Sequence, residues 1–418
     1  MEKVFASIIT IGDELLIGQV IDTNSAWIAQ ELNKNGISIK HRVAVGDVWD
    51  DIWQALDAES KQASLVIITG GLGPTADDIT KPLLCDYFGG KMIIDQPTLD
   101  HVTYLFEQVF KRPMIERNRK QAEVPDVCTV LKNARGTAPG MLFKREGKIF
   151  ISLPGVPHEM QWLMSNQVLP MIPEWFQTGY IEHRTLLTSG VGESFLAEMI
   201  IDLEEALPEW VRLAYLPNYG MVRLRLSAFG SDKNQLNTTI DHHFALLKER
   251  VAAFLVTDKD MPMELVVAEL LKNKQQTLST AESCTGGYIA HRLTEHPGAS
   301  AYFMGSVVSY DNRIKQKVLH VPGETLQTVG AVSEETVKQM AISVLELMQT
   351  DYSIAVSGIM GPDGGTAEKP VGMVWIAVAN KDKIQTKCFH FRFGRTKNIE
   401  LTATNALNLL RIFINENS

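Results

Sequence analysis

The chain has 418 residues, of which 45% are hydrophobic and 21% are charged, a composition that excludes a disordered protein. This length exceeds what one ordinary hydrophobic core holds, so we expect two or three domains. The net charge of −9 argues against a nucleic-acid partner, and no apolar run reaches the roughly 18 residues of a membrane span. Four scattered cysteines and a first segment with no signal-peptide pattern favour the cytoplasm.

Short apolar runs alternate with amphipathic patterns over the first 172 residues. Strands are expected at residues 4–11, 37–45, 65–68 and 147–153. One helix is expected between Asp22 and Asn35-Gly36, and another at 52–61. This alternation predicts a parallel sheet with helices on both faces, in which a ligand crevice lies beyond the carboxyl ends of the strands.

Glycines and carboxylates gather at those strand ends. The third strand runs into Gly70-Gly71-Leu72-Gly73-Pro74-Thr75, which is neither a Walker A loop nor a Rossmann fingerprint. Such a loop lets the backbone approach a phosphate or a fused ring, and nearby carboxylates can hold a divalent metal. In the alternative interpretation, the acids are surface helix caps and the glycines only turn the chain. The strand ends also carry Asp13, Glu14, Asp47, Asp77, Asp78, Gly155 and Glu159.

Residues 173–258 predict a small α+β domain. Alternating polar and apolar residues at 221–228 indicate a strand with one buried face. Arg223 and Arg225 could bind nucleic acid, but no row of aromatic side chains accompanies them. We therefore expect a spacer or a dimer-forming module, followed by a linker at 258–262.

The stretch Thr280-Ala281-Glu282-Ser283-Cys284-Thr285-Gly286-Gly287 is the strongest motif of the last segment, residues 262–418. A short strand precedes it and a helical pattern follows it, the usual frame of an anion site in which backbone N–H groups face the ligand. Thr285 could instead cap the following helix.

The reactive side chains of this segment are Ser283, Ser300, Tyr310, Lys315 and Ser357. No histidine falls among these motifs, so a Ser-His-Asp triad is not indicated. A serine can instead be activated by a buried lysine of lowered pKa, with a tyrosine relaying or orienting the proton. A second glycine-rich loop, residues 358–365, could supply backbone N–H groups for an oxyanion. Alternatively, Tyr310 is a core aromatic and Lys315 a surface helix residue.

Together these motifs resemble the competence/damage-inducible CinA family over nearly the full length. The resemblance rests on ITIGDELLIGQVIDTNSAWIAQEL, GGLGPTADDIT and LPGVPHEM in the first part, and on TAESCTGG, GASAYFMGSVVSYDNRIK, GAVS and SGIMGPDGG in the last. It implies an α/β fold: a three-layer α/β/α molybdopterin-binding-like domain (1–172), a KH-like α+β domain (173–258) and an α/β deamidase domain (262–418).

The resemblance also implies activities. The last domain would hydrolyse the carboxamide of nicotinamide mononucleotide (NMN) to nicotinate mononucleotide and ammonia, without a cofactor. The first would cleave ADP-ribose to AMP and ribose 5-phosphate with a divalent metal. Alternatives are a deamidase whose first domain is a nucleotide- or pterin-binding regulatory module, and, from the fold analogy alone, a molybdopterin-cofactor enzyme. We expect a homodimer and no nucleic-acid or membrane partner.

Carried over to this sequence, the family pattern makes Lys315 the base, Tyr310 the proton relay and either Ser283 or Ser300 the nucleophile. Ser357 stands at a position where threonine also occurs in the family, which keeps the hydroxyl, and Met360 replaces the commoner alanine. The nucleotide would be held in the last domain by Thr285, Gly286, Gly287, Ser357, Gly364, Gly365 and Arg395, and in the first by Gly70, Gly71, Gly73, Thr75 and Gly155. The metal ligands would be Asp47, Asp77, Asp78, Glu14 and Glu159.

Overall fold

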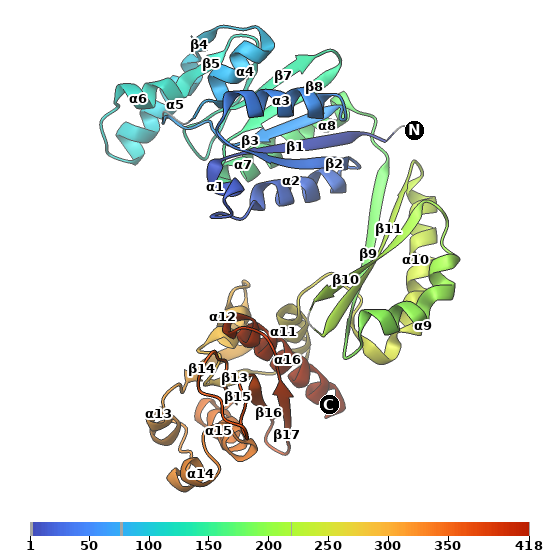
Figure 1. Cartoon of the computed structure of the whole chain (residues 1–418), viewed down its shortest axis with the longest axis vertical. Helices are drawn as coiled ribbons and strands as arrows, with labels where there is room; N and C mark the ends of the chain where they lie inside the picture. The colour runs from blue at the N-terminus through green and yellow to red at the C-terminus, as the bar shows by residue number, and fades with distance from the viewer. Residues whose placement is uncertain (1–2, 76–77, 219, 418) are drawn as a thin grey trace. The chain divides into compact units, whose positions relative to one another are not determined.

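The computed structural model describes residues 3–75, 78–218 and 220–417. The chain forms two compact units (Figure 1). The first unit contains residues 1–184, 200–214 and 225–247, and the second contains 185–199, 215–224 and 248–418. None of the helices in the described part of the chain has the length and apolar character that crossing a bilayer requires.

A six-stranded sheet forms the centre of the first unit, in the order β2-β1-β3-β8-β7-β6. Its strands are β1 (Phe5–Ile11), β2 (Ser38–Val45), β3 (Leu65–Thr69), β6 (Thr129–Leu131), β7 (Gly140–Arg145) and β8 (Lys148–Leu153). The four strands expected from the sequence are parallel, as predicted. β7 runs antiparallel to both of its neighbours, β6 and β8. It is joined to β8 by a two-residue turn at Glu146 and Gly147, whose φ angles are both positive, as a tight hairpin requires.

Two hydrophobic cores cover opposite faces of this sheet. Successive side chains of a strand point to opposite faces, and β1 accordingly sends Ile8 into one core and Ile9 into the other. The first core packs under α2 (Thr23–Lys34) and α7 (Pro157–Leu163), and the second under α3 (Trp49–Ser60) and α4 (Thr80–Phe88). The Asp22 side chain accepts a hydrogen bond from Ser25 N and caps α2, as its place in the sequence indicates.

The stretch between α4 and β7 adds elements that the sequence patterns did not predict. They are the paired strands β4 (Met92–Ile94) and β5 (Glu123–Pro125), the helices α5 (Gln96–Tyr104), α6 (Glu116–Arg119) and η2 (Lys120–Ala122), and the π-helix η1 (Leu105–Val109). The remaining helices of this part are α1 (Asp13–Leu16), η3 (Met164–Val168) and α8 (Leu169–Trp175).

The middle of the chain forms a four-stranded sheet with the order β10-β11-β9-β12. Its elements are β9 (Tyr180–Ser189), α9 (Glu193–Glu205), β10 (Val211–Asn218), β11 (Met221–Gly230), α10 (Lys233–Arg250), η4 (Ala252–Phe254) and β12 (Leu255–Thr257).

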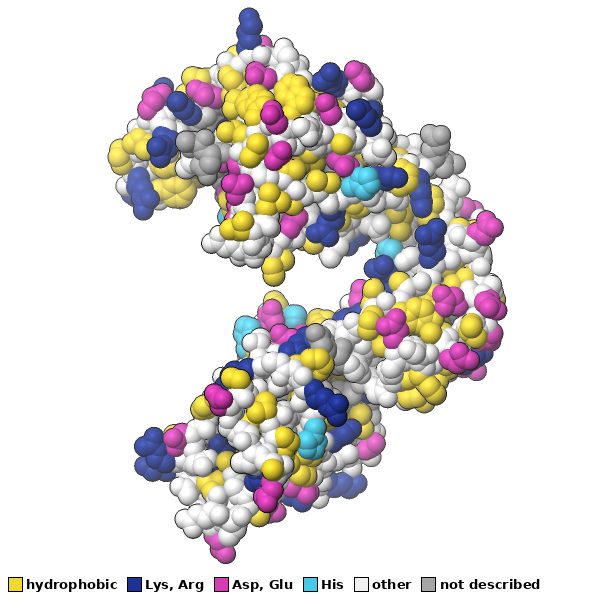
Figure 2. Space-filling model, in the orientation of Figure 1, with side chains coloured by type: hydrophobic (Ala, Val, Ile, Leu, Met, Phe, Trp, Pro, Cys, Tyr) yellow, Lys and Arg dark blue, Asp and Glu magenta, His cyan; other side chains and the backbone are white. Residues whose placement is uncertain are grey.

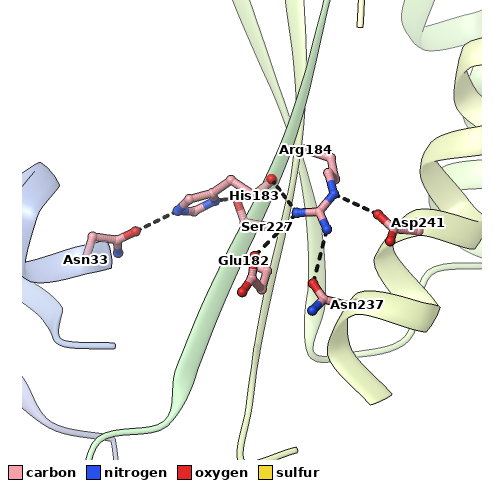
Figure 3. A network of polar contacts seen from close by, with 7 residues as sticks. All are labelled: Asn33, Glu182, His183, Arg184, Ser227, Asn237 and Asp241. Atoms are coloured by element: carbon pink, nitrogen blue, oxygen red, sulfur yellow. Dashed lines mark hydrogen bonds and ion pairs between the residues drawn. The ribbon is translucent and has the colours of Figure 1, made fainter. Parts of the chain in front are cut away.

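A polar network ties β9 to its surroundings within the first unit (Figure 3). Arg184 on β9 donates to Asp241 (2.7 Å) and Asn237 (3.1 Å) of α10. The neighbouring His183 is 2.8 Å from Ser227 Oγ of β11 and 2.6 Å from Asn33 Oδ1 of α2. These polar groups therefore satisfy one another within the fold. On the face shown in Figure 2, basic and acidic side chains are interspersed.

A five-stranded sheet with the order β14-β13-β15-β16-β17 forms the centre of the second unit. β13 (Leu278–Glu282), β14 (Phe303–Val308) and β15 (Tyr352–Gly358) are parallel, and β16 (Met373–Ala379) and β17 (Ile384–His390) form an antiparallel hairpin. The helices α11 (Met263–Lys274), α12 (Tyr288–Thr294) and α16 (Arg395–Glu416) share one core, and α15 (Glu334–Met348) packs in another. Shorter helices are η5 (Ala299–Ala301), α13 (Asn312–Lys317) and α14 (Gly323–Thr328).

Candidate functional site

A buried lysine–serine pair lies at the carboxyl edge of the second sheet. Ser283 follows β13 directly, and Lys315 lies in α13, which follows β14. Lys315 Nζ is 3.0 Å from Ser283 Oγ, and the two residues are 1% and 8% exposed. β13 lies between β14 and β15 in the sheet, so the chain steps to one side of β13 to form β14 and then crosses to its other side to form β15. Crevices form at such a reversal, which is why residues 32 positions apart meet here.

The surroundings of Lys315 favour a neutral amine. Burial lowers the pKa of Lys315, with a smaller opposing effect from Cys284 and Asp311. Its Nζ donates to the carbonyl oxygens of Ser309 (2.7 Å) and Tyr310 (3.4 Å). A neutral amine keeps two N–H donors for these carbonyls and one lone pair for the serine hydroxyl. The arrangement can therefore accept the proton of Ser283.

Ser300, the second nucleophile candidate, lies at the other edge of the sheet. It is exposed in η5, which precedes β14. The parallel register pairs Leu278 with Phe303 and Glu282 with Val308. Ser300 therefore lies at the amino edge and Ser283 at the carboxyl edge, separated by a strand that rises roughly 13 Å. No hydrogen bond among the described residues joins Ser300 to Lys315, so the structure brings only Ser283 to the lysine.

Tyr310 and Arg395 form an exposed pair beside the lysine. Arg395 NH2 donates to the Tyr310 hydroxyl at 2.9 Å, and NH1 donates to the Gly361 carbonyl at 3.0 Å. Arg395 is the first residue of α16, and the Tyr310 side chain is 60% exposed. Lys315 contacts Tyr310 only at the backbone carbonyl. The structure therefore joins the tyrosine hydroxyl to a cation that could receive an anionic group, and not to the lysine.

Glu282, which the sequence patterns did not single out, organises the turn after β13. Its side chain is fully buried and accepts hydrogen bonds from the backbone N–H groups of Gly287 (3.1 Å), Ile289 (3.0 Å) and Ala290 (2.8 Å). These groups begin α12. Thr285 does not cap this helix: its hydroxyl donates to Glu282 at 2.7 Å. The carboxylate acts as the cap, favoured by the positive end of the helix dipole.

Of the remaining predicted residues, some make buried hydrogen bonds and others lie in exposed loops. The Ser357 hydroxyl is 1% exposed and donates to the Ala331 carbonyl at 2.7 Å, so it holds the segment before α15. Ser333 caps that helix, since its side chain accepts a hydrogen bond from Thr336 N. The predicted glycines Gly286, Gly364 and Gly365 are exposed, and Gly287 is half-buried as the N-cap residue of α12.

The thiol next to Ser283 is not positioned as a nucleophile. Cys284 belongs to the hydrophobic core of the second unit. Burial raises its pKa to about 12, so it stays protonated at neutral pH.

In the first unit, the loops after β1, β3 and β8 meet at the carboxyl edge of the sheet. Gly70 has a φ of 117°, and a Cβ atom at this position would lie 2.2 Å from the carbonyl oxygen of Ile11. Only glycine fits so close to the neighbouring strand. A Cβ on Gly155 would lie 3.4 Å from the Cα of Gly70, which places the loop after β8 against the same point.

The predicted carboxylates of this crevice bind nearby polar groups. Asp78 accepts hydrogen bonds from Gly73 N (2.7 Å), Thr75 N (2.8 Å) and the Thr75 hydroxyl, so it holds the glycine-rich loop closed. Asp47 accepts from Asp13 N at 3.2 Å, and Glu14 is exposed in α1. Asn133 donates to Glu159 at 2.6 Å. Burial raises the pKa of Glu159, and the hydrogen bond from Asn133 opposes this shift. Asp77 lies outside the described residues.

These residues can be tested for their fit to a metal ion. The described residues contain no group of three or more His, Cys, Asp or Glu side chains placed to hold one together. A Cβ on Gly71 would lie 2.1 Å from the Thr80 hydroxyl and 3.7 Å from an Asp47 carboxylate oxygen, and the Thr80 hydroxyl has no hydrogen-bond partner among the described residues. Mg²⁺ is commonly held by one or two carboxylates and by substrate phosphates. Asp47 and Thr80 fit an ion of that kind, which would take its remaining ligands from water or a bound phosphate.

A pocket of about 310 Å³ opens beside these carboxylates. The sequence analysis did not select two residues in and behind this pocket. Gln121 lines the pocket from η2, and the buried Lys81 donates to its backbone carbonyl at 2.8 Å. Burial lowers the pKa of Lys81 to about 8. The pocket is lined by Gly71, Leu72, Gly73, Pro74, Asp78, Gln121, Thr137, Ala138, Pro154, Gly155, Val156 and Glu159.

Comparisons with known proteins agree with this architecture. Residues 7–174 match the model of a probable molybdopterin binding domain, 183–256 that of the damage-inducible protein CinA KH domain, and 260–414 that of the CinA C-terminal domain. A CinA-like protein of Cytophaga hutchinsonii is 47% identical over 98% of this chain and 97% of its own length. The chain belongs to the CinA family.

Other similar proteins carry related names. A CinA-like protein of Flavobacterium psychrophilum is 45% identical over 97% of each chain. The crystal structure of the competence/damage inducible protein CihA from Agrobacterium tumefaciens covers 37% of this chain and 93% of its own, with 39% identity and a TM-score of 0.36. Membership of the CinA family, with a molybdopterin-binding-like first domain, is consistent with an enzyme.

Proposed function

We propose that this chain hydrolyses the carboxamide of NMN to nicotinate mononucleotide and ammonia in its second unit. The observation that carries the proposal is the buried 3.0 Å contact between Lys315 Nζ and Ser283 Oγ. A hydroxyl beside an amine of lowered pKa is a nucleophile suited to an uncharged amide carbonyl. The nearby pair of Arg395 and Tyr310 supplies a cation for the phosphate of the substrate.

The reaction needs only residues of this chain and water. Ser283 Oγ attacks the carboxamide carbon while Lys315 takes the hydroxyl proton. Backbone N–H groups of the turn that begins at Ser283 are the candidates to stabilise the tetrahedral oxyanion. Lys315 then returns the proton to the leaving nitrogen, and ammonia and an acyl-enzyme form. Water, deprotonated by Lys315, hydrolyses that ester and restores Ser283.

Ammonia release from NMN tests this proposal, and the two serines make a matched pair. Ser283→Ala should lower kcat by roughly 10²- to 10⁴-fold, because it removes the attacking atom. Ser300→Ala should stay within about twofold of the unmodified protein, because Ser300 is exposed at the opposite sheet edge. A collapse in the Ser300 variant with Ser283→Ala still active would overturn the choice of nucleophile. No ammonia from the unmodified chain would refute the deamidase.

A second function is favoured by the crevice of the first unit. We propose that it cleaves ADP-ribose to AMP and ribose 5-phosphate, because the crevice combines a glycine-rich loop, several carboxylates and buried polar atoms without partners. Asp47 and Thr80 would hold a divalent metal, with Asp78, Asp77, Glu14 and Glu159 as further candidates. Such a metal would neutralise charge on the pyrophosphate. The Asp78 carboxylate holds the loop that would face the phosphates.

The alternative is that the first unit only binds a nucleotide or a pterin and regulates the deamidase. Detection of AMP from ADP-ribose decides between these functions. The partners that we propose are therefore small nucleotides, NMN and ADP-ribose. We also propose a cytoplasmic protein, because the four cysteines are free thiols. A homodimer without nucleic-acid or membrane partners remains our prediction for the assembly.

A further inference from the structure

A second pocket opens at the carboxyl edge of the first sheet, beside the pocket of about 310 Å³. Its volume is about 140 Å³. Residues of β1, α1, α2 and the segment between these two helices line it, among them Glu14, Val20, Ile21 and Thr23, all of which are exposed. Gly155 is also exposed and belongs to both linings. The two pockets are therefore neighbours that meet at this glycine.

The chain segments at the ends of β3 and β8 form the divide between these pockets. At the end of β3, Thr69 lines the smaller pocket and Gly71 lines the larger one. After β8, Pro157 lines the smaller pocket and Val156 lines the larger one. Each segment therefore passes from one pocket to the other, and each has a glycine at the crossing.

These two glycines are Gly70 and Gly155, and they lie against each other. A Cβ on Gly155 would lie 3.4 Å from the Cα of Gly70. Asn24 Nδ2 donates to the Gly155 carbonyl at 2.7 Å and to the Thr69 hydroxyl at 3.3 Å, which fixes both segments. Because Gly155 is exposed and has no side chain, a narrow group can pass over it from one pocket to the other.

The linings suit a ligand whose two ends are uncharged. Among the described residues, neither lining contains a lysine or an arginine, so neither pocket offers a cation to a phosphate. In the smaller pocket, Glu14 and Thr23 provide a carboxylate and a hydroxyl to which the hydroxyl groups of a sugar can hydrogen-bond. The larger pocket has exposed apolar side chains, Pro74 and Val156, that suit a planar ring.

We propose that this crevice binds a ligand with two ends in separate pockets: the terminal ribose of ADP-ribose in the smaller one, the adenosine in the larger one, and the pyrophosphate across Gly155. The inference rests on the proposed ADP-ribose reaction for the identity of the ligand. A ligand that fills both pockets should bind more tightly than one that fills a single pocket, because its second end binds intramolecularly. The candidate metal position next to Gly71 then lies beside the linker.

Calorimetric titration of the full-length protein with two ligands tests this arrangement. One is α,β-methylene ADP-ribose, whose bridging carbon prevents cleavage, and the other is AMP, both in the presence of Mg²⁺. The unmodified protein should bind the methylene analogue roughly tenfold or more tightly than AMP, because only the analogue also fills the smaller pocket. Equal Kd values for the two ligands would overturn the proposal.

A double variant that blocks the smaller pocket should remove this preference. Val20 and Ile21 line that pocket and are 50% and 83% exposed, so Val20→Trp/Ile21→Trp needs no room in the core. We expect its Kd for the analogue to come within about twofold of its Kd for AMP, with the Kd for AMP unchanged. The matched control is Leu16→Trp/Ile17→Trp, at positions 55% and 74% exposed that belong to neither lining, and it should keep the preference.

Blocking the larger pocket should act on AMP itself. Val156→Trp should weaken the Kd for AMP roughly tenfold or more, because Val156 lines the pocket assigned to the adenosine. Val127→Trp is the control, since Val127 belongs to neither lining and is 46% exposed, against 44% for Val156. Unfolding temperatures equal to that of the unmodified protein confirm that the variants fold. A folded Val156→Trp with unchanged AMP binding, or a blocked smaller pocket that weakens AMP binding, would overturn the assignment of the two ends.

The two proposals for this crevice can fail separately. If the protein cleaves ADP-ribose but binds the analogue no more tightly than AMP, the two-pocket inference is wrong and the hydrolase stands. If ADP-ribose is not cleaved but the variants change the two Kd values as expected, the hydrolase is wrong and the inference stands.

Discussion

Lys315 carries a pH dependence that its position predicts. Its pKa is lowered by burial, and only the neutral amine can accept the Ser283 proton. Activity should therefore be low while Lys315 is protonated and rise with pH through its pKa, at a midpoint below the ordinary lysine value of 10.5. The pH profile of kcat/KM for ammonia release from NMN measures that midpoint.

Lys315→Met supplies the control for this profile. It removes the base while keeping a long, uncharged side chain, so kcat should fall by roughly 10²- to 10⁴-fold without loss of folding. A flat profile in the unmodified protein between pH 6 and 10, or a midpoint at the ordinary lysine value, would refute the role of Lys315 as base.

For some single residues, the sequence alone could not predict the role. The types and order of Ser283, Tyr310 and Lys315 predicted a serine–lysine chemistry, but left Ser283 and Ser300 open. Only the parallel register of β13 and β14 separates them, because it assigns one serine to each edge of the sheet. The partner of the Tyr310 hydroxyl could not be predicted either, because Arg395 is 85 residues away in the chain and only the fold brings the two together.

At the scale of elements, the turn from β13 into α12 depends on one carboxylate. Glu282 accepts hydrogen bonds from three backbone N–H groups and from the Thr285 hydroxyl, which lie in the turn after Ser283 and in the first turn of α12. Glu282→Gln puts an NH₂ group opposite those donors. We expect it to lower the free energy of unfolding by roughly 2 kcal/mol and to reduce the kcat of the deamidase more than it raises KM.

Glu295→Gln is the matched change for this test, since Glu295 is exposed just after the same helix and should tolerate it within about 0.5 kcal/mol. Thermal unfolding and NMN kinetics of both variants make the comparison. Because Glu282 acts through the turn, the pH midpoint assigned to Lys315 should not move. Equal stability of Glu282→Gln and the unmodified chain would show that the carboxylate is not the cap.

The elements themselves were largely predictable, and the exceptions have physical reasons. Apolar runs that alternate with helical patterns predicted the parallel strands β1, β2, β3 and β8. The stretch from β4 to β6 lacks such runs, because its strands are three residues long and β4 is exposed. Gln121 lies in that stretch, so its burial could not be predicted from the sequence.

At the scale of the whole molecule, each proposed site is built from residues of one unit. Ser283, Lys315 and Arg395 belong to the second unit, and Asp47 and Gln121 to the first. Two sites with no shared residue, each on its own sheet and core, should lose activity separately, because distant changes in separate cores act additively.

A crossed experiment in the full-length protein tests this independence. Asp47→Asn should lower AMP release from ADP-ribose at least tenfold and leave ammonia release from NMN within about twofold, and Ser283→Ala should do the reverse. Chelation with EDTA should stop only the ADP-ribose reaction, since the lysine–serine mechanism uses no metal. If Asp47→Asn instead reduces ammonia release while no AMP forms in any sample, the first unit regulates the second and catalyses nothing itself. Loss of both activities in either variant, with unfolding temperatures unchanged, would mean that the two sites are coupled through the chain.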